Sequence, residues 1–333
     1  MTRRRGERET RGDGDTGTRR RGDAETRRRG DGETKVEISS RLVEPTDARD
    51  VTSPRPRVPA SPRPSFHPSK RFGQNFLRDQ RIIQHIIDAL DPRDDETIVE
   101  IGPGRGALTA PLLERAGSLV AIEFDRGLIP LLTEKFGGQE NFKLVQNDAL
   151  VADLCEMIRP ATRARVVANL PYNVATAILQ RLIEQRHCLT ELVVMLQREV
   201  VERITAEPGS AERGYLSVFV QAYCETEKLF DVAPSAFRPA PKVWSSVIRL
   251  TLRPHIAATV KDEKQLWQLV SAGFAQRRKT ILNNLRGAPS PLREIVKSHG
   301  GASIVLCRAE IDLARRAETL TLEEWARITR AIE

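Results

Sequence analysis

An alternation of short apolar runs with helical patterns constrains the fold more than any other feature of this sequence. The spacing of Ile82, Ile83, Ile86, Ile87 and Leu90 is that of an amphipathic helix. Five apolar runs follow: TIVEIG (97–102), LVAIEF (119–124), KLVQND (143–148), RVVANL (165–170) and ELVVMLQ (191–197). Strands separated by helices predict right-handed βαβ units and a mostly parallel sheet with helices on both faces. A β-pair within 228–252 is expected to close this α/β domain.

The pattern becomes all helical beyond about residue 255, which predicts a domain boundary there. The helical segments are WQLVSAGF, TILNNL, EIDLARRAETL and LEEWARITRAI. We therefore expect an α/β domain over 69–255 and a small C-terminal helical domain over 256–333.

Residues 1–68 differ from the rest in composition. Residues 3–34 form an imperfect octad repeat, RRRGERET RGDGDTGT RRRGDAET RRRGDGET, and residues 52–68 are rich in Pro and Arg. Segments of this composition can bury too little apolar surface to offset the loss of chain entropy on folding. We therefore expect residues 1–68 to form a disordered head followed by an extended linker. The head could be an RNA tether, a solvated tail or the product of a start codon assigned too far upstream. We expect deletion of 1–65 to leave cooperative thermal unfolding intact, and loss of that transition would show that the head is structural.

Composition excludes several classes of protein. No apolar run approaches the roughly 18 residues of a membrane span, and the charged N-terminus is not a secretory signal. The cysteines at 155, 188, 224 and 307 are widely spaced, which predicts no metal site and no disulfide framework, as in a reducing cytoplasm. A net charge of +8 favours a polyanionic partner. Nothing in the sequence demands more than a monomer.

A glycine-rich loop follows the first strand of the predicted sheet. Gly102-Pro103-Gly104-Arg105-Gly106 permits a tight turn and close approach of a ligand to the backbone. Gly102, Gly104 and Ala107 also satisfy the dinucleotide fingerprint, so the loop alone fits NAD, S-adenosylmethionine or a merely structural turn.

Acidic residues end two successive strands beside this loop. Glu123 suits the hydroxyls of a ribose, and Asp148 suits an adenine amino group, although a single strand-end acid is often a helix N-cap. Because carboxyl ends of parallel strands converge on one crevice, both acids are expected at the same site. Glu100 could offset the charge of a sulfonium.

The tetrapeptide Asn169-Leu170-Pro171-Tyr172 at the next strand end distinguishes between these cofactors. An exocyclic adenine amine is a poor nucleophile that needs acceptors for its protons. The Asn169 side chain and the Pro171 carbonyl can accept them, while Tyr172 offers a face for stacking. A dehydrogenase has no use for this group, so the sequence favours methyl transfer.

From Lys70 onward the chain resembles the ribosomal RNA adenine-N6 dimethyltransferase family, in particular its bacterial small-subunit branch. The matching segments cover some 260 residues in order and include KRFGQNFL, VEIGPGRGALT, ANLPYNVAT, FRPAPKVWSSVIRL and RRKTILNNL. The resemblance implies a Rossmann-like class I methyltransferase with a seven-stranded sheet. NDAL departs slightly from the family's pattern, and the head has no counterpart in it.

The resemblance also implies roles for individual residues. The implied cofactor contacts are Asn75, Leu77, Gly102, Glu123, Asp148 and Asn169. Phe237 is expected to face the target adenine opposite Tyr172, although a core aromatic is the competing interpretation. Arg277, Arg278 and Lys279 are expected to meet RNA phosphates, the alternative being a solvated helix face. The C-terminal helical domain over 256–333 is accordingly expected to bind RNA.

The implied reaction is dimethylation of the N6 amines of two adjacent adenosines in a hairpin loop near the 3′ end of 16S rRNA. The implied cofactor is S-adenosylmethionine, and the implied partner is the small ribosomal subunit in the cytoplasm. Three alternatives are a 23S rRNA methyltransferase of the macrolide-resistance type, a non-catalytic assembly factor of the same fold, and a DNA adenine methyltransferase. The last is disfavoured by Leu170, where DNA enzymes usually carry proline.

Overall fold

The computed structural model describes residues 75–333, which lie within one compact unit. The predicted disordered head, the linker and the first residues of the KRFGQNFL segment fall outside the described residues. No helix in the described part of the chain has the length and apolar character needed to cross a membrane.

A seven-stranded sheet forms the centre of the α/β part, in the order β4-β3-β2-β5-β6-β9-β7. Neighbouring strands from β4 to β6 are parallel, whereas β9 is antiparallel to both β6 and β7. The strands are β2 (Thr97–Ile101), β3 (Ser118–Glu123), β4 (Phe142–Gln146), β5 (Ala164–Asn169), β6 (Leu189–Gln197), β7 (Cys224–Val232) and β9 (Ser245–Leu252). The expected sheet and its closing β-pair are confirmed.

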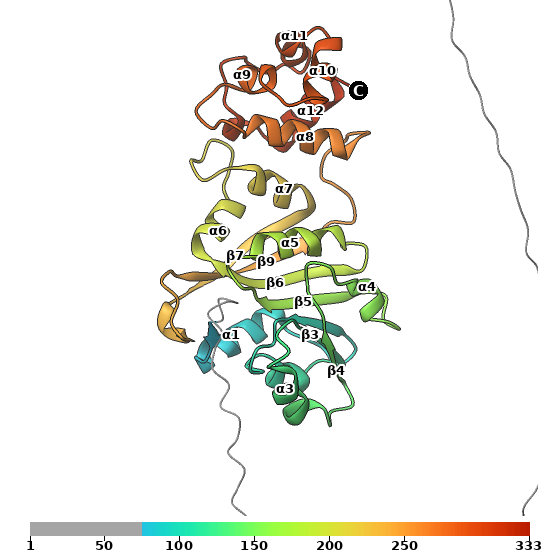
Figure 1. Ribbon diagram of the computed structural model, residues 1–333, viewed down its shortest axis with the longest axis vertical. Helices are drawn as coiled ribbons and strands as arrows, with labels where there is room; N and C mark the ends of the chain where they lie inside the picture. Colours follow the sequence, from blue (N-terminus) through green and yellow to red (C-terminus); the bar gives the residue numbers. More distant parts are fainter. Residues whose placement is uncertain (1–74) are drawn as a thin grey trace, which may run out of the picture. The chain divides into compact units, whose positions relative to one another are not determined.

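Helices cover both faces of the sheet, with α1 and α3 on one side and α5 to α7 on the other (Figure 1). Neighbouring residues of β2 show why: Ile98 packs into the cluster containing α1, and Val99 into the cluster containing α5. The helices are α1 (Gln80–Leu90), α2 (Thr109–Leu113), α3 (Ile129–Phe136), α4 (Leu154–Met157), α5 (Ala175–Glu184), α6 (Arg198–Ile204) and α7 (Tyr215–Tyr223). Alternating apolar side chains are therefore buried on both faces.

The segment after β9 is helical and has its own apolar cluster, to which Val218 of α7 also contributes. Its helices are α8 (Glu263–Gly273), α9 (Ile281–Arg286), α10 (Leu292–Ser298), α11 (Ala302–Arg308) and α12 (Leu322–Arg330). Because α7 joins this cluster, the division at residue 255 stays a prediction.

One expected helix in this segment is wrong. EIDLARRAETL (310–320) forms turns, with only a 3₁₀ turn, η3, at Ala317–Thr319. Glu310 has a left-handed φ of 57°, and Ile311 N–H donates to the Leu306 carbonyl at 2.9 Å, which terminates α11. The Asp312 side chain then accepts from Ala314 N–H at 2.9 Å. These local hydrogen bonds compete with helix formation.

A two-stranded pairing outside the main sheet joins distant parts of the chain. β1 (Phe76–Leu77) runs antiparallel to β8 (Phe237–Arg238), after the 3₁₀ turn η2 (Pro234–Ala236). β1 is followed by α1, whose N-cap residue is Asp79, and the Asp79 carboxylate accepts from backbone N–H groups in the first turn of the helix. This pairing ties the segment around Asn75 to the loop that precedes β9.

Cys155 and Cys188 form a disulfide, so the expectation of single cysteines is wrong for this pair. Their 33-residue separation hid the pairing, because it depends on α4 packing beside the turn between α5 and β6. His187 Nε2 lies 3.0 Å from Cys155 Sγ, and the three side chains could hold a metal only with free thiolates. In the disulfide neither sulfur offers one.

Reduction of this disulfide is expected to lower thermal stability. A cross-link closing a loop of this length typically contributes about 2–4 kcal/mol, so the melting temperature should fall by several degrees. Differential scanning fluorimetry with and without a phosphine reductant measures the fall. Cys155→Ser is the control, since its melting temperature should not respond to reductant. An unchanged wild-type value, or an equal shift in the variant, would contradict the structural role.

Candidate active site

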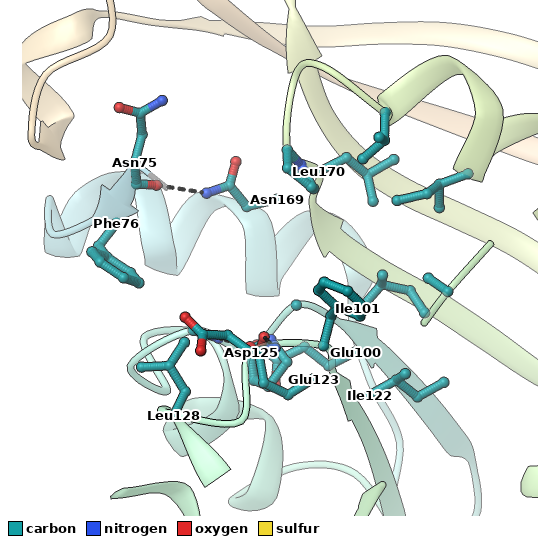
Figure 2. A pocket seen from close by; sticks show the side chains of 18 of the residues that line it. Asn75, Phe76, Glu100, Ile101, Ile122, Glu123, Asp125, Leu128, Asn169 and Leu170 are labelled. Atoms are coloured by element: carbon teal, nitrogen blue, oxygen red, sulfur yellow. Dashed lines mark hydrogen bonds between the residues drawn. The ribbon is translucent and has the colours of Figure 1, made fainter. Parts of the chain in front are cut away.

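A cavity of about 350 Å³ lies beyond the carboxyl ends of β2, β3, β4 and β5. The order of strands along the sheet reverses between β2 and β5, which is the place where open α/β sheets bind ligands. Figure 2 shows Asn75 and Asn169 across the cavity from Glu123 and Asp125. The cavity is lined by eight of the residues that the sequence predicts for the site: Asn75, Leu77, Gly102, Glu123, Asp148, Asn169, Pro171 and Tyr172.

The glycine loop forms one wall of the cavity. Gly104 and Gly106 have φ of +61° and +82°, which L side chains rarely adopt. A Cβ on Gly106 would also lie 2.4 Å from the Phe136 ring. The Arg105 guanidinium carbon lies 4.9 Å from the centroid of the Phe76 ring, so β1 lies against the glycine loop.

Glu123 lines the cavity at the end of β3, where the sequence predicts contact with the hydroxyls of a ribose. It is 6% exposed at the end of β3 and accepts from Gly104 N–H at 3.1 Å and Asp125 N–H at 2.8 Å. Burial raises its pKa, while these backbone hydrogen bonds act in the opposite direction. Each oxygen retains accepting capacity for a ligand hydroxyl.

Glu100 lies deeper and is 2% exposed. Burial raises its pKa to about 8, and the negative charge of Glu123 adds to the rise. A hydrogen bond of 2.6 Å from Thr109 Oγ1 to Glu100 Oε2 counteracts part of the rise. A cation in the cavity would favour the ionised form.

Asp148 lies two residues beyond β4 and organises the next turn. Its Oδ1 accepts from Leu150 N–H at 2.9 Å, and Asn147 Oδ1 accepts from Asp148 N–H at 2.7 Å. Leu150 and Asn147 also line the cavity. The carboxylate shapes this turn and lines the cavity, but it caps no helix, because the N-cap of α4 is Asp153. Contact with an adenine amine stays a prediction.

Asn169 ends β5 with its amide already oriented. Its Nδ2 donates to the Asn75 carbonyl at 3.2 Å (Figure 2), which leaves the side-chain oxygen for a ligand proton. The Pro171 carbonyl accepts from Val174 N–H at 3.1 Å, and its second lone pair can accept again. Two acceptors thus lie in one loop.

Tyr172 is held by a residue that the sequence did not single out. Its hydroxyl lies 2.5 Å from Ser245 Oγ, and Ser245 is fully buried at the start of β9. Burial raises the pKa of Tyr172, which stays a neutral phenol. The only sequence signal for Ser245 is its place in the FRPAPKVWSS segment, because the contact spans 73 residues.

Phe237 does not line the cavity. It is 5% exposed and packs in the cluster that contains α1, opposite Leu77 in the β1–β8 pair. This packing fits the competing interpretation of a core aromatic, and contact with a target base stays a prediction.

Arg277, Arg278 and Lys279 are exposed on the turn between α8 and α9, not on a helix face. The Arg277 guanidinium donates to the Ala211 carbonyl, which ties this turn to the loop before α7. Contact with RNA phosphates stays a prediction for all three residues.

Comparisons with known proteins agree with this geometry. The family model for ribosomal RNA adenine dimethylase matches residues 66–327. A small-subunit rRNA methyltransferase A of Saccharophagus degradans is 42% identical over 79% of this chain and 94% of its own. The solved 23S rRNA methyltransferase ErmE is 26% identical, with a TM-score of 0.59 over 78% of this chain and 99% of its own. A dimethyladenosine transferase of Plasmodium falciparum is similar in fold, with a TM-score of 0.65, 22% identity and coverage of 76% and 95%.

Proposed function

Because this chain belongs to the ribosomal RNA adenine dimethylase family, we propose that it dimethylates the N6 amines of two adjacent adenosines in 16S rRNA. The small-subunit assignment rests on relatives about 41% identical that carry that name, whereas the 23S enzyme is less similar. The observation that carries the proposal is one cavity that unites the glycine loop, Glu123, Asp148 and the Asn169–Tyr172 loop.

The donors and acceptors of the cavity fit the cofactor. S-adenosylmethionine supplies an electrophilic methyl group on a sulfonium. Glu123 accepts from the ribose hydroxyls, Asp148 from the adenine amine, and the Gly102 loop allows close backbone approach. Asn75 and Leu77 of the β1 segment cover the site beside Asn169.

The Asn169–Tyr172 loop positions the target amine. The Asn169 oxygen and the Pro171 carbonyl accept the two N6 protons, and the Tyr172 ring stacks on the base. As the N–C bond forms and the S–C bond breaks, N6 becomes acidic and loses a proton to solvent through these acceptors. Polar groups fixed before the reaction stabilise the developing positive charge.

The cellular setting is also proposed. We propose that the protein acts on ribosomal RNA in the cytoplasm, although the disulfide removes the support that cysteine usage had offered. We propose that the chain acts as a monomer on the small subunit.

Label transfer to ribosomal subunits tests the reaction. Purified protein is incubated with labelled S-adenosylmethionine and either unmethylated 30S or unmethylated 50S subunits. We expect N6,N6-dimethyladenosine in 16S rRNA alone. Label in 23S rRNA would move the chain to the resistance branch, and cofactor binding without label in either would indicate an assembly factor.

The raised pKa of Glu100 predicts that cofactor affinity depends on pH. Its pKa of about 8 means that it is mostly protonated at pH 6.5, and a bound sulfonium favours loss of that proton. Affinity for S-adenosylmethionine should therefore rise with pH, by up to about 10-fold per pH unit, until about pH 8. Above that pH the affinity should level off. S-adenosylhomocysteine, whose sulfur is neutral, should show less dependence.

Isothermal titration calorimetry with both ligands at pH 6.5 and 8.5 measures this difference. Glu100→Gln should remove the extra pH dependence. Equal pH dependence for the two ligands, or its persistence in Glu100→Gln, would exclude Glu100 as the titrating group.

A further inference from the structure

We propose that Trp244 stacks on an unpaired RNA base that flanks the target adenosine, an inference that rests on the proposed function. Trp244 lies in the loop between β8 and β9 and is 49% exposed, and its neighbour Val243 is 43% exposed. In the described residues these two form a rare exposed apolar pair. Burying an indole face against a ligand is favourable because it removes a large apolar area from water.

The position of Trp244 links it to the catalytic loop. The next residue, Ser245, is fully buried and lies 2.5 Å from the Tyr172 hydroxyl. The Trp244 carbonyl accepts from Arg198 N–H at 2.9 Å, directly after β6. The backbone of Trp244 is thus held on its C-terminal side, close to the tyrosine proposed to stack on the target base.

The surroundings of Trp244 suit a nucleic acid strand. Arg238 and Lys242 are exposed in the same segment, and Pro239 and Pro241 restrict the loop backbone. Cationic side chains beside an exposed aromatic match a phosphate backbone with splayed bases. Loops of RNA hairpins offer such unstacked bases, and aromatic side chains commonly recognise them.

Tryptophan fluorescence gives a direct measurement of this contact. The chain has three tryptophans, of which Trp325 is fully buried and Trp267 packs among Tyr215, Phe219 and Tyr223. A synthetic RNA hairpin with two adjacent loop adenines should quench the fluorescence of the full-length protein. The quench should disappear in Trp244→Ala. A quench that persists in this variant, or its absence in the wild type, would overturn the proposal.

Kinetics with unmethylated 30S subunits provide the second measurement. Trp244→Ala should raise KM for the subunit on the order of 10-fold, with the Kd for S-adenosylmethionine unchanged. Trp244→Phe should recover most of the loss because a phenyl ring still stacks. Ile304→Ala, which removes an apolar side chain of similar exposure (46%) on α11, is the matched control.

The outcomes separate this inference from the proposed function. An equal rise in KM for Ile304→Ala, or an unchanged KM in Trp244→Ala, would overturn the role of Trp244 while methylation stands. If the wild type binds the cofactor but methylates neither subunit, the proposed function fails. A hairpin quench that depends on Trp244 would then still support the base contact.

Discussion

Replacing Asn169 by alanine is expected to lower turnover on 30S subunits roughly 10²–10³-fold, by analogy with the loss of one transition-state polar contact. The variant loses the side-chain oxygen that accepts an N6 proton. It also loses the 3.2 Å hydrogen bond to the Asn75 carbonyl, which holds the β1 segment beside the loop. Single-turnover label transfer at saturating cofactor and subunit concentrations measures the chemical step.

Asn173→Ala is the matched control for this experiment. Asn173 lines the same cavity four residues later and is exposed, but no catalytic role is assigned to it. Its turnover should stay within a few-fold of the wild type. Near-normal turnover of Asn169→Ala would remove Asn169 from the mechanism, and an equal loss in Asn173→Ala would indicate damage to the whole loop.

Replacing Glu123 by alanine is expected to weaken binding of S-adenosylmethionine on the order of 10²-fold or more. Hydrogen bonds to a charged group contribute about 1.5–3 kcal/mol each, and the two ribose hydroxyls provide two of them. The substitution also leaves Gly104 N–H and Asp125 N–H without their acceptor, which loosens the glycine loop. Calorimetric titration with the cofactor measures the change in Kd.

Two further variants identify the origin of any loss. Glu123→Gln retains one accepting oxygen and should bind with intermediate affinity. Glu134→Ala removes an exposed carboxylate of α3 and should bind like the wild type. An unchanged Kd in Glu123→Ala would show that the ribose assignment is wrong. A parallel fall in melting temperature would mean that the loop, and not the ligand contact, was lost.

Much of the fold follows from local sequence pattern. The run at 97–102 is one residue longer than β2, and the runs at 119–124 and 165–170 are shifted by one residue from β3 and β5. Strand length and apolar patterning are local properties of a segment. Each strand could therefore be predicted without knowing which strands it pairs with. The convergence of Gly102, Glu123, Asp148 and Asn169 followed from one rule, since the carboxyl ends of parallel strands meet at one edge.

Features that depend on two distant segments could not be predicted in this way. The disulfide joins residues 33 apart, the Tyr172–Ser245 contact spans 73, and Asn75 reaches Asn169 across 94. Phe237 is an aromatic beside a predicted site, yet its register opposite Leu77 places it in the core. A sequence pattern carries no information about such pairings.

The helical part shows the same division at shorter range. The apolar spacing of α12 and its Thr321–Glu324 capping box are readable from the sequence, and the helix is present. EIDLARRAETL has helix-forming residues, but the left-handed Glu310 and the Asp312 turn divert its backbone. The sequence by itself determined the strands, the glycine loop and the chemistry of the strand ends, because these depend on neighbouring residues. Tertiary structure alone decided which side chains orient Asn169 and Tyr172, because the free energy of those contacts arises only when distant segments pack together.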